Sequence, residues 1–193
     1  YSLSLVSHFL AGNNLRNALL FTADPYSKVL DPEDYVTGLL FGDAACCTLL
    51  GRDGRYRIGK SLFCTDGRKH DALQTDASRR LRMDGKSIFN FTMRMVPPQI
   101  RECLAINGLE KEDVDLFLLH QASKYIVDNI RQALDIPEQR MPFSAYTTGN
   151  TVSSSLALLL CEVMGAGPRH ILLSGFGVGL SWASTVLTST REL

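Results

Sequence analysis

The sequence predicts an α/β fold, in which helices cover the faces of a β-sheet, from three observations. Short apolar runs with the length of a buried strand occupy residues 114–119 and 170–174. Segments with helical spacing, at 123–134 and 151–164, separate these runs. Strands that alternate with helices in this way are typical of a sheet covered by helices.

The bulk composition is that of a globular protein and excludes several functional classes. The 193 residues suffice for one large domain or two small ones, and 20 basic residues balance 20 acidic ones. A net charge of zero gives no electrostatic basis for binding nucleic acid or an anionic membrane. The apolar run 156–160 is far shorter than the ~20 residues that span a bilayer. We therefore expect neither nucleic acid nor a membrane as a partner.

The cysteines indicate a reducing environment. They form an odd set without a C-x-x-C pair, which argues against a disulfide framework and against a zinc site. We therefore expect a cytoplasmic protein that binds no metal. The cysteines are Cys46, Cys47, Cys64, Cys103 and Cys161.

The first part of the chain is expected to hold a helix followed by strands. The opening YSLSLVSHFLAG has an amphipathic helical pattern and no initial methionine, so the chain is expected to be the remainder of a longer protein. A strand is predicted at 17–24, and two apolar stretches lie within 38–51. The polar segment 52–85 is predicted to form strand edges and surface connections.

In the second part of the chain, prolines interrupt a helical pattern. Helical spacing covers 89–103, with Pro97 and Pro98 inside it. Proline fits the first turn of a helix but not its interior, so a new helix is predicted to start at Pro97. A turn is predicted at 135–137, and a last strand at 181–187.

One local basic cluster stands out from the balanced charge pattern. It consists of Arg79, Arg80, Arg82 and Lys86. Solvated surface residues and a site for an acidic partner are the two interpretations that the sequence leaves open.

Three polar segments lie where predicted strands end or helices begin. His120 follows the strand at 114–119, and ligands in open α/β sheets collect at such strand ends. Asn150 lies near the N-terminus of the helix predicted at 151–164. GFGVG, at 175–179, joins two predicted strands, whereas a dinucleotide-binding loop is followed by a helix. The backbone N–H groups of GFGVG could instead face a ligand, as in an oxyanion hole. A core histidine and a plain turn with a helix cap remain the alternatives for His120 and Asn150.

Three motifs together resemble the C-terminal part of a β-ketoacyl-acyl-carrier-protein synthase III. They are HQAS at 120–123, GNTVSSS at 149–155 and GFGVGLSW at 175–182, and YSLSLV, LLFGDAA and MDGKSIFNF extend the resemblance over nearly the whole chain. The resemblance implies a thiolase-like layered α/β/α/β/α fold that is incomplete. It divides the chain into the end of an N-terminal half, a connector and a whole C-terminal half, at 1–60, 61–86 and 87–193.

The resemblance implies an acyltransferase that performs a decarboxylative Claisen condensation in fatty-acid or related biosynthesis. A cysteine takes the acyl group of an acyl-CoA as a thioester. Neutral His120 and Asn150 then donate hydrogen bonds to the carbonyl of a malonyl thioester as carbon dioxide leaves. Loss of one such donor typically costs ~3 kcal/mol of barrier.

The same resemblance implies roles for further residues. The backbone N–H of Val178, beside Gly177, belongs to a second oxyanion hole. Phe89 and Phe176 match apolar positions near the acyl or pantetheine tunnel. Ala122 and Ser123 are implied in substrate binding; Ser123 stands where the family usually has an asparagine.

The implied substrates are thioesters, with no other cofactor. They are acyl-CoA and malonyl-acyl carrier protein, although Tyr35 replaces an arginine near CoA in many relatives, which leaves the choice between CoA and carrier protein open. The nucleophilic cysteine is expected shortly before Tyr1, outside this chain. A homodimer, or pairing with the missing N-terminal segment, is implied.

Two other functions remain open on the sequence alone. The chain could be a nucleophile-free scaffold subunit that partners an active one. It could also be a related acyltransferase that forms esters or amides without decarboxylation, with His120 as general base. The presence of both His120 and Asn150 favours the condensing enzyme over the scaffold.

Overall fold

The chain folds into stacked layers of helices and strands, and the computed structural model describes residues 1–191. The strands are β1 (Asn17–Asp24), β2 (Ala44–Gly51), β3 (Tyr56–Thr65), β4 (Leu73–Thr75), β5 (Leu81–Met83), β6 (Leu116–Leu119), β7 (His170–Gly177) and β8 (Ser181–Ser189). The α-helices are α1 (Ser2–Gly12), α2 (Tyr35–Gly38), α3 (Gly85–Ile106), α4 (Lys124–Leu134) and α5 (Ser155–Val163). Short 3₁₀ helices are η1 (Tyr26–Lys28), η2 (Gly67–Ala72), η3 (Lys111–Asp113), η4 (Glu138–Arg140), η5 (Val152–Ser154) and η6 (Met164–Ala166).

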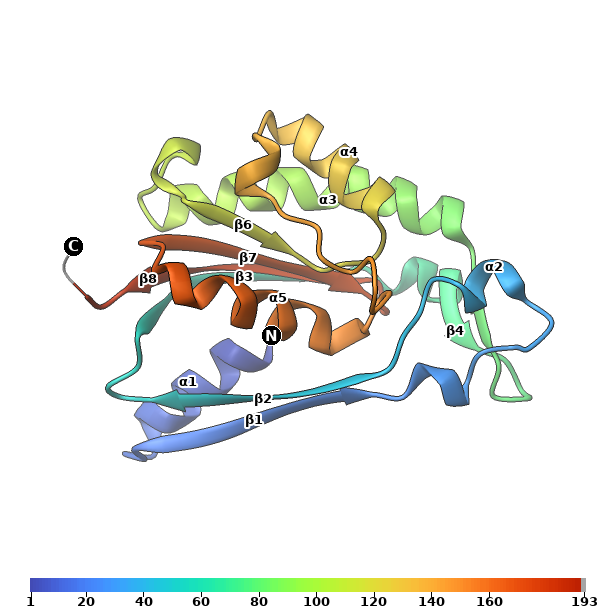
Figure 1. Ribbon diagram of the computed structural model, residues 1–193, viewed down its shortest axis with the longest axis horizontal. Coiled ribbons are helices and arrows are strands. Elements are labelled where there is room, and N and C mark those ends of the chain that lie inside the picture. The colour runs from blue at the N-terminus through green and yellow to red at the C-terminus, as the bar shows by residue number, and fades with distance from the viewer. Residues whose placement is uncertain (192–193) are drawn as a thin grey trace.

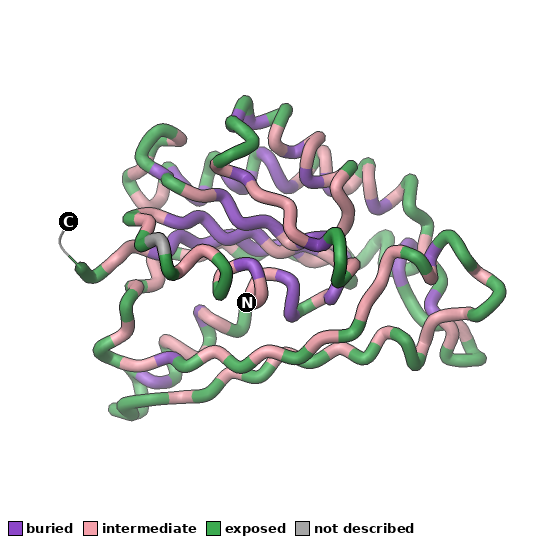
Figure 2. Tube along the Cα trace, in the orientation of Figure 1, coloured by how far each residue is buried: buried purple, intermediate pink, exposed green. Residues whose placement is uncertain are grey.

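The central sheet has the strand order β3-β8-β7-β6. Strand β6 runs parallel to β7, whereas β8 is antiparallel to both of its neighbours. Phe117 and Leu119 pack with side chains of α3 and α4, while Leu118 packs on the opposite face with Leu159 of α5. Both faces of β6 are therefore covered, which explains its unbroken apolar run. The sheet and the helices on it form the largest buried region in Figure 2.

Helix α3 corrects one expectation, because it runs without a break through Pro97 and Pro98, where the sequence predicts a new helix. The buried stripe of the helix continues across the prolines, from Val96 to Ile100, both fully buried. Each proline removes one backbone hydrogen bond and crowds the preceding turn. Burial of the stripe against the sheet offsets this cost, since tertiary packing supplies most of the stability of helices in proteins.

The other predicted elements are present, with shifts at their ends. Strand β6 begins later than predicted, β7 extends further, and the helix predicted at 151–164 starts as η5 before it becomes α5. The polar segment 52–85 holds β3, at the edge of the central sheet, and the short hairpin of β4 and β5. No helix within residues 1–191 has the length and apolar character that crossing a membrane requires.

Strands β1 and β2 form a separate antiparallel pair. In Figure 1, α3 and α4 cover one face of the central sheet, and α1 and α5 lie between its other face and the β1–β2 pair. The described residues thus hold four of the five expected layers. Within residues 1–191, neither outer edge of the β1–β2 pair has a partner strand. Leu19, Phe21 and Leu49 are 60%, 70% and 68% exposed.

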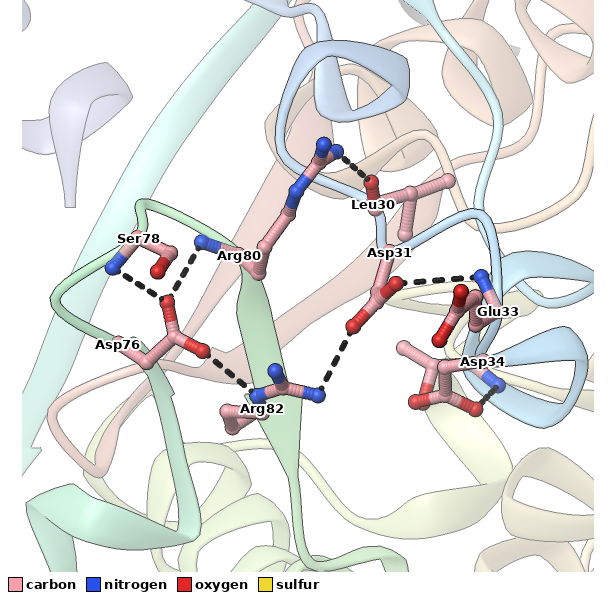
Figure 3. A network of polar contacts seen from close by, with 9 residues as sticks. Leu30, Asp31, Glu33, Asp34, Asp76, Ser78, Arg80 and Arg82 are labelled. Carbon is pink, nitrogen blue, oxygen red and sulfur yellow. Dashed lines mark hydrogen bonds and ion pairs between the residues drawn. The ribbon is translucent and has the colours of Figure 1, made fainter.

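The predicted basic cluster contributes to the internal structure. The Arg82 guanidinium contacts the carboxylates of Asp76 at 2.8 Å and Asp31 at 3.1 Å, and Arg80 donates to the Leu30 carbonyl at 2.7 Å (Figure 3). Hydrogen bonds, first among them one from the Arg80 backbone N–H, hold the pKa of Asp76 below its usual range. These contacts fasten the loop after η1 to the β4–β5 hairpin, which favours a structural role for Arg80 and Arg82.

Candidate active site

One cavity of about 570 Å³ is lined by every site residue that the sequence predicts. Because β6 and β7 are parallel neighbours, the segments that follow them emerge at the same edge of the sheet, and the cavity lies there. The predicted residues that line it are Phe89, His120, Ala122, Ser123, Asn150, Phe176, Gly177 and Val178.

His120 directly follows β6, and its backbone N–H donates to the Ser174 carbonyl at 2.8 Å. On one side of the imidazole, Nδ1 lies 2.7 Å from the Ser155 hydroxyl. The Phe176 ring stands edge-on to it, with centroids 5.4 Å apart and planes at 79°. Although part of His120 faces the cavity, burial lowers its pKa from 6.5 to about 4. The ring is therefore neutral at pH 7.

Asn150 is fixed through both its backbone and its side chain. Its backbone N–H donates to the Leu40 carbonyl at 2.7 Å, and its carbonyl accepts the Gly42 N–H at 3.0 Å. The side-chain Oδ1 accepts the Val152 N–H at 2.9 Å. Since a backbone N–H can only donate, this contact identifies which end of the amide is the oxygen. The Nδ2 amide group remains as the donor that Asn150 can offer to a ligand.

The turn around Asn150 needs unusual backbone angles. Gly149 has φ +66°, and a Cβ atom there would lie 2.9 Å from the Leu40 carbonyl oxygen, so glycine is required. Val152 has φ +51°, an uncommon conformation for a β-branched residue. Such conformations persist where the surroundings over-determine them, and they cluster at functional sites. Here the hydrogen bond from Val152 to Asn150 is one such constraint.

Two serines fasten this turn to strand β1. The backbone N–H of Ser153 donates to the Asp24 carboxylate at 3.0 Å, and its hydroxyl donates to the same carboxylate. The Ser154 hydroxyl donates to the Thr22 carbonyl at 3.1 Å. The β1–β2 layer thereby helps to position Asn150. These anchors were not found by sequence reasoning, although the SSS run within 149–155 offered a compositional signal.

The glycine turn between β7 and β8 forms another wall of the cavity. Gly177 is the last residue of β7, and Val178 begins the turn with 53% of its surface exposed. Within residues 1–191, the Val178 N–H takes part in no backbone hydrogen bond outside the regular strands. That leaves a donor beside the cavity, as expected for an oxyanion hole.

Aromatic side chains line much of the remaining cavity. Phe89 stacks on Tyr125 with ring centroids 5.1 Å apart, and Tyr26 stacks on Phe41 at 4.8 Å. Ser123 caps helix α4 by accepting the Ile126 N–H at 3.3 Å. Sequence reasoning missed Tyr26 and Phe41, because Tyr26 lies in the short 3₁₀ helix η1 and Phe41 lies outside the helices and strands, so neither belongs to a periodic pattern.

Gln121 was also missed by sequence reasoning, although it belongs to the HQAS motif. It is 2% exposed, and its Nε2 donates to the Leu119 carbonyl at 2.8 Å. Its Oε1 accepts the Ser144 N–H at 2.9 Å. Gln121 thus holds the loop before Asn150 against the end of β6.

Neither a thiol nor a metal-binding cluster lies in this cavity within the described part of the chain. None of the five cysteines lines it. Residues 1–191 also hold no group of three or more histidine, cysteine, aspartate or glutamate side chains that could bind a metal ion. What the cavity does offer is a neutral imidazole, a carboxamide and a free backbone N–H.

Two family models match the chain. The model described as 3-oxoacyl-[acyl-carrier-protein] synthase III matches residues 1–67, and the C-terminal model of the same enzyme matches residues 104–189. A curated relative, β-ketoacyl-[acyl-carrier-protein] synthase III of Streptococcus equi subsp. zooepidemicus, is 31% identical over 206 aligned positions. The alignment covers 97% of this chain and 64% of that relative.

Solved structures resemble the chain over the same extent. The β-ketoacyl-[acyl-carrier-protein] synthase III of Thermus thermophilus is 31% identical with a TM-score of 0.90, over 97% of this chain and 64% of that one. The 3-oxoacyl-[acyl-carrier-protein] synthase III of Aquifex aeolicus is 28% identical with a TM-score of 0.92, over 97% and 63%. These likenesses confirm the predicted α/β, thiolase-like fold class. The chain spans a little under two thirds of the length of these relatives.

Proposed function

Because the chain belongs to the 3-oxoacyl-[acyl-carrier-protein] synthase III family, we propose that it carries the carbonyl-binding donors of a β-ketoacyl synthase. The proposed reaction is a decarboxylative Claisen condensation between an acyl group and a malonyl thioester. The proposed setting is fatty-acid or related biosynthesis in the cytoplasm. Acyl-CoA and malonyl-acyl carrier protein are the proposed substrates, and the assembly is proposed to be a homodimer.

The reaction has two stages. First, a cysteine thiol takes the acyl group from acyl-CoA as a thioester, and CoA leaves as a free thiol. Since none of the cysteines within residues 1–191 lines the cavity, this thiol is proposed to come from outside them. Second, the bond between the malonyl carboxylate and methylene carbons breaks, and carbon dioxide leaves. The electron pair passes into the malonyl thioester, which becomes an enolate.

His120 and Asn150 are proposed to stabilise this enolate. Nε2 of His120 and Nδ2 of Asn150 donate to its oxygen, where negative charge develops. The enolate carbon then attacks the acyl carbonyl, whose oxyanion accepts the Val178 N–H, in the turn with Gly177. The bond to the cysteine sulfur breaks, and that sulfur takes up a proton. Phe89, Phe176, Ala122 and Ser123 are proposed to line the substrate path.

One observation carries this proposal: the two polar side chains are prepared as donors in one apolar cavity. Burial keeps His120 neutral, and the Val152 N–H occupies the oxygen of Asn150 and leaves its NH₂ group to donate. A low-dielectric cavity with fixed donors is what an enolate needs, because such donors require no reorganisation as the charge forms.

Asn150→Asp tests the proposal directly. Aspartate keeps an oxygen for the Val152 N–H, so the turn is retained, but it replaces the NH₂ donor by a second oxygen. We expect release of labelled carbon dioxide from malonyl-acyl carrier protein to fall by roughly 10²–10³-fold in kcat. The assay uses the full-length polypeptide that contains this chain, with a panel of acyl-CoA primers.

A matched control is Asn129→Ala, which removes a carboxamide from helix α4, outside the cavity lining. It should leave carbon dioxide release unchanged. If Asn150→Asp releases carbon dioxide at the wild-type rate, the proposed role of Asn150 is wrong. If the wild type forms no acyl-enzyme with any primer, as judged by intact mass, a scaffold role gains support instead.

A further inference from the structure

Ser155 occupies a position directly behind the His120 ring. It is the first residue of α5 and is 3% exposed. Its Oγ atom lies 2.7 Å from His120 Nδ1, 2.9 Å from the Val152 carbonyl oxygen and 3.4 Å from the Gln121 backbone nitrogen. Ser155 does not line the cavity, so any effect it has on a substrate acts through His120.

The Ser155 hydroxyl has one proton and two acceptors within reach. If the proton points to His120, Nδ1 accepts it, and the neutral ring carries its own proton on Nε2. If the proton points to the Val152 carbonyl, Nδ1 must carry the ring proton and donate to Oγ. Nε2 then has a lone pair and can only accept. The direction of this hydroxyl therefore decides whether His120 is a donor or a base at Nε2.

Two observations favour the direction toward His120. The separation of 2.7 Å matches the usual length of a hydrogen bond donated by a hydroxyl, whereas bonds donated by N–H groups are mostly longer. The Val152 carbonyl also accepts the backbone N–H of Ser155 itself, so it is satisfied without the hydroxyl.

We propose that Ser155 is a positioning residue that holds neutral His120 as the Nε2–H tautomer. This inference rests on the proposed condensation, for which Nε2 must donate to the malonyl thioester carbonyl. It also separates that reaction from acyl transfer without decarboxylation. There His120 would act as a general base and would need a bare Nε2.

Nitrogen NMR on the full-length polypeptide with ¹⁵N-labelled histidine reads the tautomer without any substrate. The wild type should show a protonated Nε2 and an unprotonated Nδ1 for His120. Ser155→Ala removes the hydroxyl donor and should shift the ring toward a mixture of tautomers, whereas Ser155→Thr keeps the donor. The matched control is Ser154→Ala, a neighbouring serine that is fully buried but bonds to β1 and β2 instead of His120.

Kinetics supplies the second readout. Ser155→Ala should lower kcat for carbon dioxide release by about 10-fold or more, less than the 10²–10³ expected for loss of a donor itself. KM for the malonyl thioester should change little, and Ser155→Thr should restore much of kcat. Ser154→Ala should leave the tautomer unchanged.

The outcomes separate this inference from the proposed function. A wild-type His120 with its proton on Nδ1 would overturn the inference, even where a variant fails to fold. So would a Ser155→Ala variant with an unchanged tautomer and unchanged kcat. If the tautomer depends on Ser155 but no malonyl thioester is decarboxylated, the proposed function is wrong while the positioning role stands.

Discussion

Replacement of His120 by glutamine should remove a pH dependence of stability that the wild type shows. Burial lowers the folded-state pKa of His120 from 6.5 to about 4. Between these values the unfolded chain binds a proton at this residue and the folded chain does not. The free energy of unfolding should therefore fall as the pH falls. The shift corresponds to roughly 3 kcal/mol, of which about 2–3 kcal/mol is lost between pH 7 and about pH 4.5.

Urea denaturation of the full-length polypeptide across this pH range measures the effect. The difference in unfolding free energy between the wild type and His120→Gln should change by about 2–3 kcal/mol between pH 7 and about pH 4.5. A matched control is His70→Gln, which removes an exposed histidine outside the cavity and should keep the wild-type pH dependence. A difference between wild type and His120→Gln that stays constant with pH would refute the reasoning. An NMR titration of the His120 ring with a midpoint near 6.5 would refute it as well.

Three further predictions concern thiols, the proline-containing helix and the core. Iodoacetamide should label the exposed Cys161 but not Cys103, because burial raises the pKa of the Cys103 thiol to about 11. Peptide mass spectrometry measures this, and equal labelling of the two would contradict it. Pro98→Ala should raise the free energy of unfolding, measured in urea, by roughly 1–2 kcal/mol, since Pro98 is exposed inside α3 and alanine restores a backbone donor. A decrease would show that the prolines fit the helix better than expected. Because Ile130 is fully buried, Ile130→Ala should lower the free energy of unfolding by about 2–5 kcal/mol and Ile130→Val by about 0.5–1.5 kcal/mol. Equal losses of stability in the two variants would contradict the packing argument.

The sequence was sufficient to predict the elements that carry His120 and Asn150. The apolar run at 114–119 ends where β6 ends, and a polar residue directly after such a run must lie at the edge of the sheet. The parallel pairing of β6 and β7 then brings their following segments together. This is why His120 and the turn at Val178 line one cavity. Asn150 follows neither strand and is held there by its backbone hydrogen bonds to Leu40 and Gly42. The domain division at 1–60, 61–86 and 87–193 stays a prediction.

Other features could not be predicted because they depend on tertiary contacts. Pro97 has a strong local preference against a helix interior, yet the buried stripe on either side of it overrides that preference. Val152 has no local signal for a positive φ, since its conformation depends on contacts such as its bond to Asn150. The role inferred for Ser155 depends on a hydroxyl direction, and no periodicity in the chain reports a side-chain rotamer.

The serine contacts between the Asn150 turn and β1 have a consequence for how the protein can diverge. Asp24 and Thr22 do not line the cavity, yet Ser153 and Ser154 transmit their positions to the backbone beside Asn150. Selection would therefore act on substitutions in this part of β1 through their effect on the Asn150 turn as well as through their effect on folding. Swapping the β1–β2 segment between homologous proteins should succeed only when the serine run is exchanged with it.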